Sequence, residues 1–226
     1  MSTQIYLCNI RALDDEDKYK SAYESVDSTR RAKADRYRMQ ADKCRCVVAG
    51  CLLRYGLLLQ NVYDCDMGVS ESGKPFLKNH KDIFFNLSHA GDEVMCVISD
   101  KECGCDVEMY AHNGMEEIAE RFYSKKELEY ATSADNNEEK IHRLIRQWTV
   151  KESVLKANGS GLSGGVDSVD AILPNAIGSV FHIRDYSLVE FVSNKDYAYT
   201  VAILGDLGEY SVNRVEVEDI LMQFDS

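Results

Sequence analysis

The chain has 226 residues, a length that suits one large domain or two small ones. Its 45% hydrophobic content is enough for a buried core, and its ordinary charged fraction of 28% argues against a disordered chain. The net charge of -12, from 38 acidic and 26 basic side chains, argues against a general nucleic-acid-binding protein, because the phosphate backbone favours basic surfaces.

Several sequence features indicate the compartment. The first residues lack the basic segment and apolar run of a secretory signal. The apolar stretch 47–59 is interrupted by Gly50, Arg54 and Gly56 and is too short to span a bilayer. The eight cysteines have no zinc-site spacing, so we expect reduced thiols. We therefore expect a cytoplasmic protein with no membrane and no nucleic-acid partner.

The first half of the chain begins with a strand and continues with helices. Residues 5–10 are typical of a short strand, and the acidic run 14–17 suits the positive end of a helix dipole. Residues 30–59 are expected to form one helix, with apolar residues dense in its second half. The Ser-Glu-Ser-Gly-Lys-Pro segment at 70–75 predicts a loop.

Three strand-like runs follow at 83–88, 94–99 and 103–107, separated by short turn sequences. Their close spacing predicts an antiparallel meander. Ser124 and Glu127 form a capping-box pattern that predicts a helix start. A longer helix is predicted from about residue 138 to 158, where Gly159 is well placed to end it.

The last third is again rich in strand-like runs, at 179–184, 187–192 and 197–204. Each half of the chain therefore shows a long helix followed by strands. This order suggests an α+β fold with two similar lobes, although no repeat is visible at the level of residues.

Asp106 and Glu108 are two residues apart on a predicted strand. Side chains alternate along a strand, so both carboxylates project from one face, with backbones about 6–7 Å apart. Two convergent carboxylates suit Mg²⁺, which in proteins binds few carboxylates together with substrate phosphates. Taken alone, such a pair is more often two exposed acids at the end of a strand.

Two further segments carry polar residues that suit a phosphate site. Glu152 and Lys156 are four residues apart on one helix face, with Trp148 one turn earlier; alone they would be an exposed ion pair beside a core tryptophan. Ser88 and His89 end a strand before a turn and have groups that hydrogen-bond phosphate, although a single such histidine is more often an ordinary surface residue.

The segment 30–45 reverses the charge of the chain, with seven basic residues against two acidic ones. Such a segment is either a solvated helix face or a site for a phosphate or an acidic partner. Lys74, between Gly73 and Pro75, is a further candidate phosphate contact.

Together these residues resemble the Sfp-type 4'-phosphopantetheinyl transferases. The resemblance covers about residues 73–163 and is carried by ordered motifs, of which each is weak alone. The motifs are Gly73-Lys74-Pro75, Asn86-x-Ser88-His89, Gly104-x-Asp106-x-Glu108 and Trp148-x-x-Lys151-Glu152-Ser153-x-x-Lys156. Cys103 and Cys105 depart from the aliphatic residues common beside the aspartate, but cysteine packs as a small hydrophobe.

The resemblance implies a fold and a reaction. The fold is α+β, with two similar lobes in a pseudo-twofold arrangement, each a long helix packed on an antiparallel sheet; we place the lobes at residues 1–105 and 106–226. The reaction moves the 4'-phosphopantetheine arm of coenzyme A to a serine of an apo-carrier protein (acyl, peptidyl or aryl) and releases adenosine 3',5'-bisphosphate.

The resemblance also implies residue roles. Asp106, Glu108 and Glu152 would hold Mg²⁺, Glu152 would accept the proton of the carrier serine, and Lys156 would stabilise the pyrophosphate. The expected contacts to the nucleotide end of coenzyme A, its 3'-phosphate included, are Lys74, Ser88, His89, Arg45, Lys33 and Arg36. The role of Glu127 stays open between function and helix capping.

Two other functions use the same residues. One is a metal-dependent phosphohydrolase that cleaves a coenzyme A or nucleotide pyrophosphate without an acceptor protein. The other is an inactive coenzyme A-binding sensor or scaffold. We expect a monomer, since two lobes in one chain complete a site between them.

Overall fold

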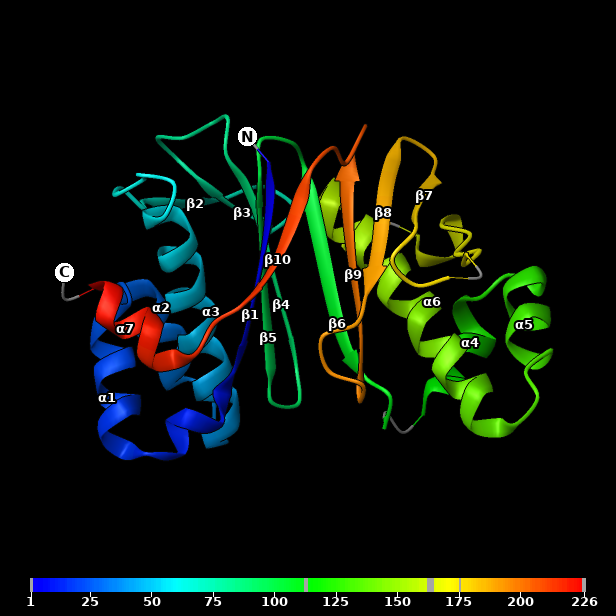
Figure 1. Ribbon diagram of the computed structural model, residues 1–226, viewed down its shortest axis with the longest axis horizontal. Helices are drawn as coiled ribbons and strands as arrows, with labels where there is room; N and C mark the ends of the chain where they lie inside the picture. The colour runs from blue at the N-terminus through cyan, green and yellow to red at the C-terminus, as the bar shows by residue number, and fades with distance from the viewer. Residues whose placement is uncertain (1, 112–113, 162–164, 175, 225–226) are drawn as a thin grey trace.

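The computed structural model describes residues 2–111, 114–161, 165–174 and 176–224. Two four-stranded sheets stand face to face in the centre, with helices on both outer sides (Figure 1). The first sheet has the order β10-β1-β5-β4, and the second has the order β6-β9-β8-β7. All strand pairs are antiparallel except β1 with β10. The structure thus confirms an α+β fold of two lobes.

The first lobe packs its helices on the outer face of the first sheet. Its elements are β1 (Thr3–Asn9), η1 (Ile10–Asp14), α1 (Glu16–Ser25), α2 (Ser28–Asp35), α3 (Gln40–Leu58), β2 (Met67–Val69), β3 (Pro75–Leu77), β4 (Phe84–Ala90), β5 (Glu93–Ser99), β10 (Tyr210–Arg214) and α7 (Val217–Phe224). The small β2-β3 hairpin lies outside the main sheet.

The second lobe is built in the same way around α6. Its elements are β6 (Cys103–Met109), α4 (Met115–Phe122), α5 (Lys125–Thr132), α6 (Asn137–Asn158), η3 (Val166–Ser168), β7 (Val180–Ile183), β8 (Tyr186–Phe191) and β9 (Tyr197–Leu204). Helix α6 packs on β6 and β9, as α3 packs on β1, β4 and β5. Each lobe therefore has one long helix on one sheet.

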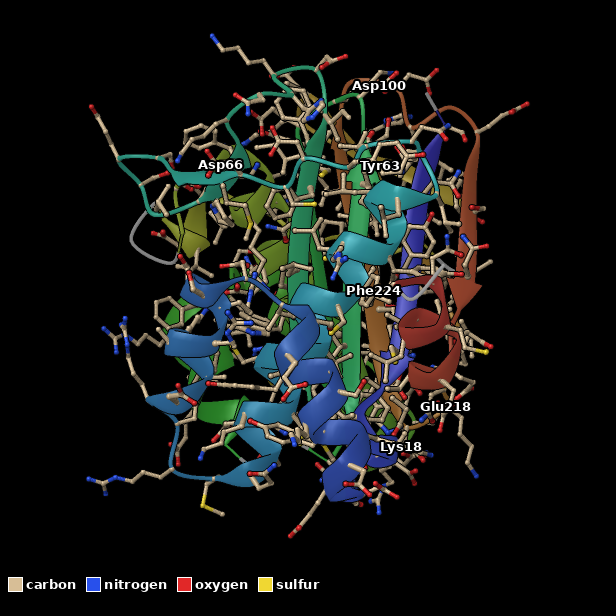
Figure 2. All side chains as sticks on the ribbon, turned by 90° about the vertical axis from the view of Figure 1, so that its left-hand side faces the viewer. Lys18, Tyr63, Asp66, Asp100, Glu218 and Phe224 are labelled. Carbon is tan, nitrogen blue, oxygen red and sulfur yellow. The ribbon has the colours of Figure 1, made fainter. Side chains whose placement is uncertain are left out.

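The C-terminal elements return to the first lobe. Strand β10 pairs in parallel with β1, and α7 packs on α1 and α3. Lys18 of α1 forms an ion pair with Glu218 of α7, and the Arg54 guanidinium lies 4.1 Å from the centre of the Phe224 ring (Figure 2). Because β6 belongs to the second sheet and β10 to the first, the chain passes between the lobes twice.

An apolar layer between the two sheets holds the lobes together. Ile5 and Leu7 of β1 point into this layer, while Tyr6 and Cys8 between them face the helices of the first lobe. Both faces of β1 are therefore buried. The carboxylate of Glu93 on β5 is also buried; it accepts a hydrogen bond from Tyr199 of the second sheet at 3.1 Å. A polar contact thus adds to the apolar contacts between the lobes.

Most predicted elements are confirmed, and two expectations are wrong. The expected helix 30–59 is two helices, α2 and α3, with a break after Asp35 and a new start at Gln40. The meander ends at β5, because β6 pairs with β9 in the other sheet. All eight cysteines are free, as expected. Among the described residues, no helix has both the length and the apolar character needed to cross a bilayer.

Candidate active site

The two sheets meet at β4 and β6. Hydrogen bonds that involve side chains, and not a backbone ladder, join these two strands. The Asn86 side-chain oxygen accepts a hydrogen bond from the Cys105 backbone N–H at 2.9 Å. The Ser88 hydroxyl donates to Asp106 Oδ1 at 2.7 Å. Both donors and acceptors are buried, which strengthens these bonds. The Asn86-x-Ser88 motif therefore connects the lobes at the site.

Gly104 allows α6 to lie directly against β6. A Cβ atom at this position would stand 2.0 Å from the Ser153 carbonyl oxygen and 2.4 Å from the Ala157 nitrogen. No side chain fits in that space, so the helix backbone touches the strand. This close approach carries Glu152 and Lys156 to the carboxylates of β6.

Lys156 lies at the centre of the cluster. Its ammonium nitrogen is 2.6 Å from Asp106 Oδ1, 3.1 Å from Ser88 Oγ and 3.9 Å from Glu152 Oε2. Glu108 follows Asp106 on the same face of β6 and interacts electrostatically with the same groups. The structure thus brings five of the predicted site residues together from β4, β6 and α6.

Two carboxylates of this cluster, Glu108 and Glu152, have raised pKa values. Burial, followed by the charges of Asp106 and Glu152, raises the pKa of Glu108 to about 7. Burial and the charge of Asp106 also raise the pKa of Glu152, and Lys156 opposes both shifts. Burial would lower the pKa of Lys156, but its carboxylate neighbours raise it. The site has an excess of negative charge that one lysine does not balance.

This excess fits a divalent cation. Asp106 Oδ2 is shielded from solvent and has no hydrogen-bond partner among the described residues. Carboxylate oxygens are the ligands that Mg²⁺ prefers. Within the described part of the chain, no three His, Cys, Asp or Glu side chains already have the spacing of a formed metal site. Asp106 Oδ1 instead accepts a hydrogen bond from the Lys156 ammonium.

A cavity of about 740 Å³ lies beside the cluster in the first lobe. Its lining includes the cationic side chains of Arg30 and Lys33 and the imidazole of His89. Partial desolvation, followed by the positive charges of Arg45, Lys156 and Lys33, lowers the pKa of His89. The remaining lining comes from α2, α3, β4, the β2-β3 hairpin and the segments beside them, with Tyr37, Gly73, Pro75 and the acidic Asp27 and Asp66 among it. A large cavity with convergent cations suits a phosphorylated ligand.

A second hollow of about 380 Å³ shares His89 with this cavity and reaches Glu108 of the cluster. It is lined in part by Arg45, His89 and Glu108. Arg45 donates to the Gly91 carbonyl and to Asp42 Oδ1, both at 2.6 Å. His89 lines both spaces, so it stands between the cationic cavity and the carboxylate cluster.

Two predicted phosphate contacts lie elsewhere. Arg36 is the exposed C-cap residue of α2 and is absent from the lining of both spaces. The Lys74 ammonium lies in a different pocket and is engaged by protein oxygens. Conversely, Arg30 lines the larger cavity but was not among the predicted phosphate contacts. It lies in the basic segment, and only knowledge of which face of the short helix α2 turns toward the cavity would have selected it.

Glu127 is fully buried and paired with Lys151, with 2.8 Å between Oε1 and Nζ. Its Oε2 accepts from the Ser124 N–H in the predicted capping box, and its Oε1 accepts from the Ala171 N–H. Glu127 therefore caps α5 and ties it to α6 and to the segment after η3.

Comparisons with known proteins agree with this geometry. The family model of the 4'-phosphopantetheinyl transferase superfamily matches residues 102–202. A 4'-phosphopantetheinyl transferase of Bacillus subtilis is 30% identical over 170 residues, covering 73% of this chain and 72% of the relative. The 4'-phosphopantetheinyl transferase psf-1 of Bacillus pumilus is 27% identical over 88% of both chains. The 4'-phosphopantetheinyl transferase HetI of Nostoc is 26% identical over 91% of this chain and 90% of its own.

The matched region holds the carboxylates of β6 and all of α6, and the relatives extend the likeness over both lobes. The chain belongs to the 4'-phosphopantetheinyl transferase superfamily and is an enzyme of that class.

Proposed function

We propose that the enzyme transfers the phosphopantetheine arm of coenzyme A to a serine of an apo-carrier protein in a Mg²⁺-dependent reaction. The observation that carries the proposal is the cluster of Asp106, Glu108, Glu152 and Lys156 beside a cationic cavity. In the reaction, the serine oxygen bonds to the phosphorus next to the pantetheine. The bond to the second phosphate breaks, and adenosine 3',5'-bisphosphate leaves.

The larger cavity is proposed as the site of the adenosine end. Its volume of about 740 Å³ is within the range of small-molecule sites. Lys33 provides positive charge there and His89 a ring nitrogen that can hydrogen-bond, and we assign them to phosphate contacts together with Arg45 of the neighbouring hollow. A pyrophosphate that reaches from this cavity toward Ser88 would end at Lys156 and the carboxylates. Arg36 is exposed and makes no buried contact, so we propose that it only attracts the anion at long range.

The proposed metal ligands are Asp106, Glu108 and Glu152. A cation bound there would neutralise charge that develops on the leaving phosphate. The chain's own residues hold the reactants in place: Ser88 fixes Asp106 by a hydrogen bond, and Lys156 provides a positive charge that is available to the pyrophosphate.

Glu152 is proposed to accept the proton of the carrier serine, directly or through water. Its side chain is 15% exposed, whereas that of Asp106 is 3% exposed, so an incoming serine reaches Glu152 more readily than Asp106. A base must come within hydrogen-bond reach of the proton that it accepts, and only a partly exposed carboxylate meets this condition for a protein substrate.

The partner and compartment follow from the same proposal. The carrier would dock beside the hollow at Arg45, where the basic segment offers local attraction despite the net charge of -12. All of the proposed site residues come from one chain, so we propose that a monomer is active. The eight free thiols agree with a reducing compartment, and we propose the cytoplasm.

The test is to incubate the enzyme with Mg²⁺, coenzyme A and a panel of apo-carriers, and to measure the mass of each carrier. We expect a gain equal to one phosphopantetheine arm, abolished by EDTA and restored by Mg²⁺. Coenzyme A cleavage without a carrier would indicate a phosphohydrolase instead. No gain on any carrier, with an active relative as the positive control, would refute the proposal.

A further inference from the structure

Lys74 makes contacts that its expected phosphate role does not explain. Its ammonium nitrogen lies 2.6 Å from Glu102 Oε2, 2.7 Å from the Ala157 carbonyl oxygen and 3.3 Å from the Cys103 carbonyl oxygen. These three acceptors belong to the chain just before β6, the last turn of α6 and the first residue of β6. An ammonium has three protons to donate, so its hydrogen-bonding capacity is already used.

The end of α6 needs such a donor. The last four carbonyl groups of a helix have no partner within the helix, and the C-terminal end of the helix dipole attracts a positive charge. Ala157 is in the last turn of α6, directly after Lys156. The Lys74 ammonium therefore caps the helix one residue away from the side chain that contacts Asp106.

The turn that carries Lys74 is itself closed and packed on α6. The Lys74 N–H donates to the Ser70 hydroxyl at 3.0 Å, and the Ser70 N–H donates to the Lys74 carbonyl at 2.9 Å. A Cβ atom on Gly159, the C-cap of α6, would lie 3.2 Å from Ser72 Oγ and 3.5 Å from Lys74 Cδ. The backbone at the helix end thus lies against side chains of the turn.

The same turn borders the proposed nucleotide cavity. Gly73 and Pro75, the neighbours of Lys74, line the cavity of about 740 Å³, whereas Lys74 itself points to the other side. One side chain therefore connects the rim of the nucleotide cavity to β6 and α6, which carry the carboxylates and Lys156.

We infer that Lys74 is a positioning residue, which holds the rim of the nucleotide cavity against the ends of β6 and α6 and so sets the place of Lys156 and Glu152 relative to the bound nucleotide. Glu102 is its ionic partner in this role. The inference rests on the proposed function for its kinetic consequence, but the contact itself is a property of the free protein.

Four single variants and the double variant Lys74→Met/Glu102→Gln separate this role from a phosphate contact. Lys74→Met removes the ammonium and keeps the length of the side chain, Lys74→Arg restores a charged donor, and Glu102→Gln weakens the tether without touching the cavity lining. Lys125→Met is the matched control, since Lys125 pairs with Glu129 at 3.6 Å on the exposed surface of α5 and lines neither the cavity nor the hollow.

For a positioning residue, Lys74→Met should lower kcat by about ten- to hundredfold, because small displacements of reacting groups are costly. The salt dependence of coenzyme A binding should not change. Glu102→Gln should lower kcat less, the double variant should be no worse than Lys74→Met, and Lys74→Arg should recover part of the rate. Lys125→Met should behave as the wild type.

A direct phosphate contact predicts the opposite pattern. Glu102→Gln would then leave coenzyme A affinity unchanged or raise it, and Lys74→Met would weaken binding with a shallower salt dependence; that result would overturn the inference. Thermal unfolding of the ligand-free protein is the independent readout. The positioning role requires that Lys74→Met and Glu102→Gln lower the melting temperature non-additively. If the two substitutions lower the melting temperature non-additively but the wild type modifies no carrier, the proposed function is wrong, while the contact between Lys74 and Glu102 is still supported.

Discussion

The buried pair of Lys151 and Glu127 allows a quantitative prediction. Both side chains are completely buried, with 2.8 Å between the charged atoms. Lys151 also donates to the Val166 carbonyl at 3.2 Å and to the Val169 carbonyl. Its nitrogen lies 5.2 Å from the centre of the Tyr123 ring. The ammonium thus joins α6 to α5 and to the segment around η3.

Replacing Lys151 with Met keeps the volume but leaves the Glu127 carboxylate buried without its cation. Two backbone N–H groups still reach this carboxylate, from Ser124 at 2.7 Å and from Ala171 at 2.6 Å. Removing one partner of a buried ion pair costs about 3–5 kcal/mol. We expect that loss of unfolding free energy for Lys151→Met, or a melting temperature lower by roughly 6–20 °C for a chain of this size.

The assay is urea unfolding followed by circular dichroism, with calorimetry for the melting temperature. The double variant Lys151→Met/Glu127→Gln should be more stable than Lys151→Met alone, because the amide removes the uncompensated charge. The matched control is Lys125→Met/Glu129→Gln, which removes an exposed pair on the same helix α5 and should change the free energy of unfolding by less than about 1 kcal/mol.

Two results would contradict this reasoning. One is a loss of unfolding free energy of less than about 1 kcal/mol for Lys151→Met, since a buried carboxylate without its cation should destabilise the fold by more than that. The other is a double variant whose loss equals the sum of the two single losses, because the two charges would then not act as a pair.

Three further predictions concern the site and the junction between the lobes. Gly104→Ala should lower both the melting temperature and the transfer rate, since its Cβ would stand 2.0 Å from the Ser153 carbonyl oxygen; wild-type values for both would show that α6 can shift without consequence. Tyr199→Phe should cost about 1.5–3 kcal/mol in chemical unfolding, because it removes a buried donor to the Glu93 carboxylate, and a change below about 0.5 kcal/mol would contradict this. Asp106→Asn should raise the Mg²⁺ concentration for half-maximal activity by at least about tenfold, and an unchanged Mg²⁺ dependence would remove Asp106 from the proposed ligand set.

Elements with a local signal were predictable from the sequence. Ser124 and Glu127 form the complete capping box at the start of α5, and Gly159 ends α6 with the left-handed φ of 71° that glycine adopts most readily. Alternation along β6 correctly placed Asp106 and Glu108 on one face, because the period of a strand is two residues.

Strand partners were not predictable in the same way. The run at 103–107 follows β5 closely, yet β6 pairs with β9, since the two sheets bury an apolar layer between them that no short-range pattern specifies. Likewise β10 pairs with β1, although almost the whole sequence separates the two strands. The break between α2 and α3 lacks proline and glycine, so the sequence at 36–39 carried no strong signal for it.

In the site, the sequence spacing predicted which carboxylates share a strand face, but it did not predict which atoms each lysine contacts. Lys74 and Lys156 both stand in motifs of the family, and both are basic residues suited to phosphate. Only the fold shows that Lys156 reaches Asp106 while Lys74 reaches the end of α6. Side chains that join distant segments depend on the packing of whole elements.

The most direct test of the proposed function is the mass of an apo-carrier after incubation with the enzyme, coenzyme A and Mg²⁺, in parallel with Asp106→Ala. The proposal predicts that the wild type adds one phosphopantetheine arm to the carrier serine, only when Mg²⁺ is present, and that the folded Asp106→Ala variant adds none. An arm added equally by the variant, or in EDTA, would contradict the assignment of the carboxylate cluster.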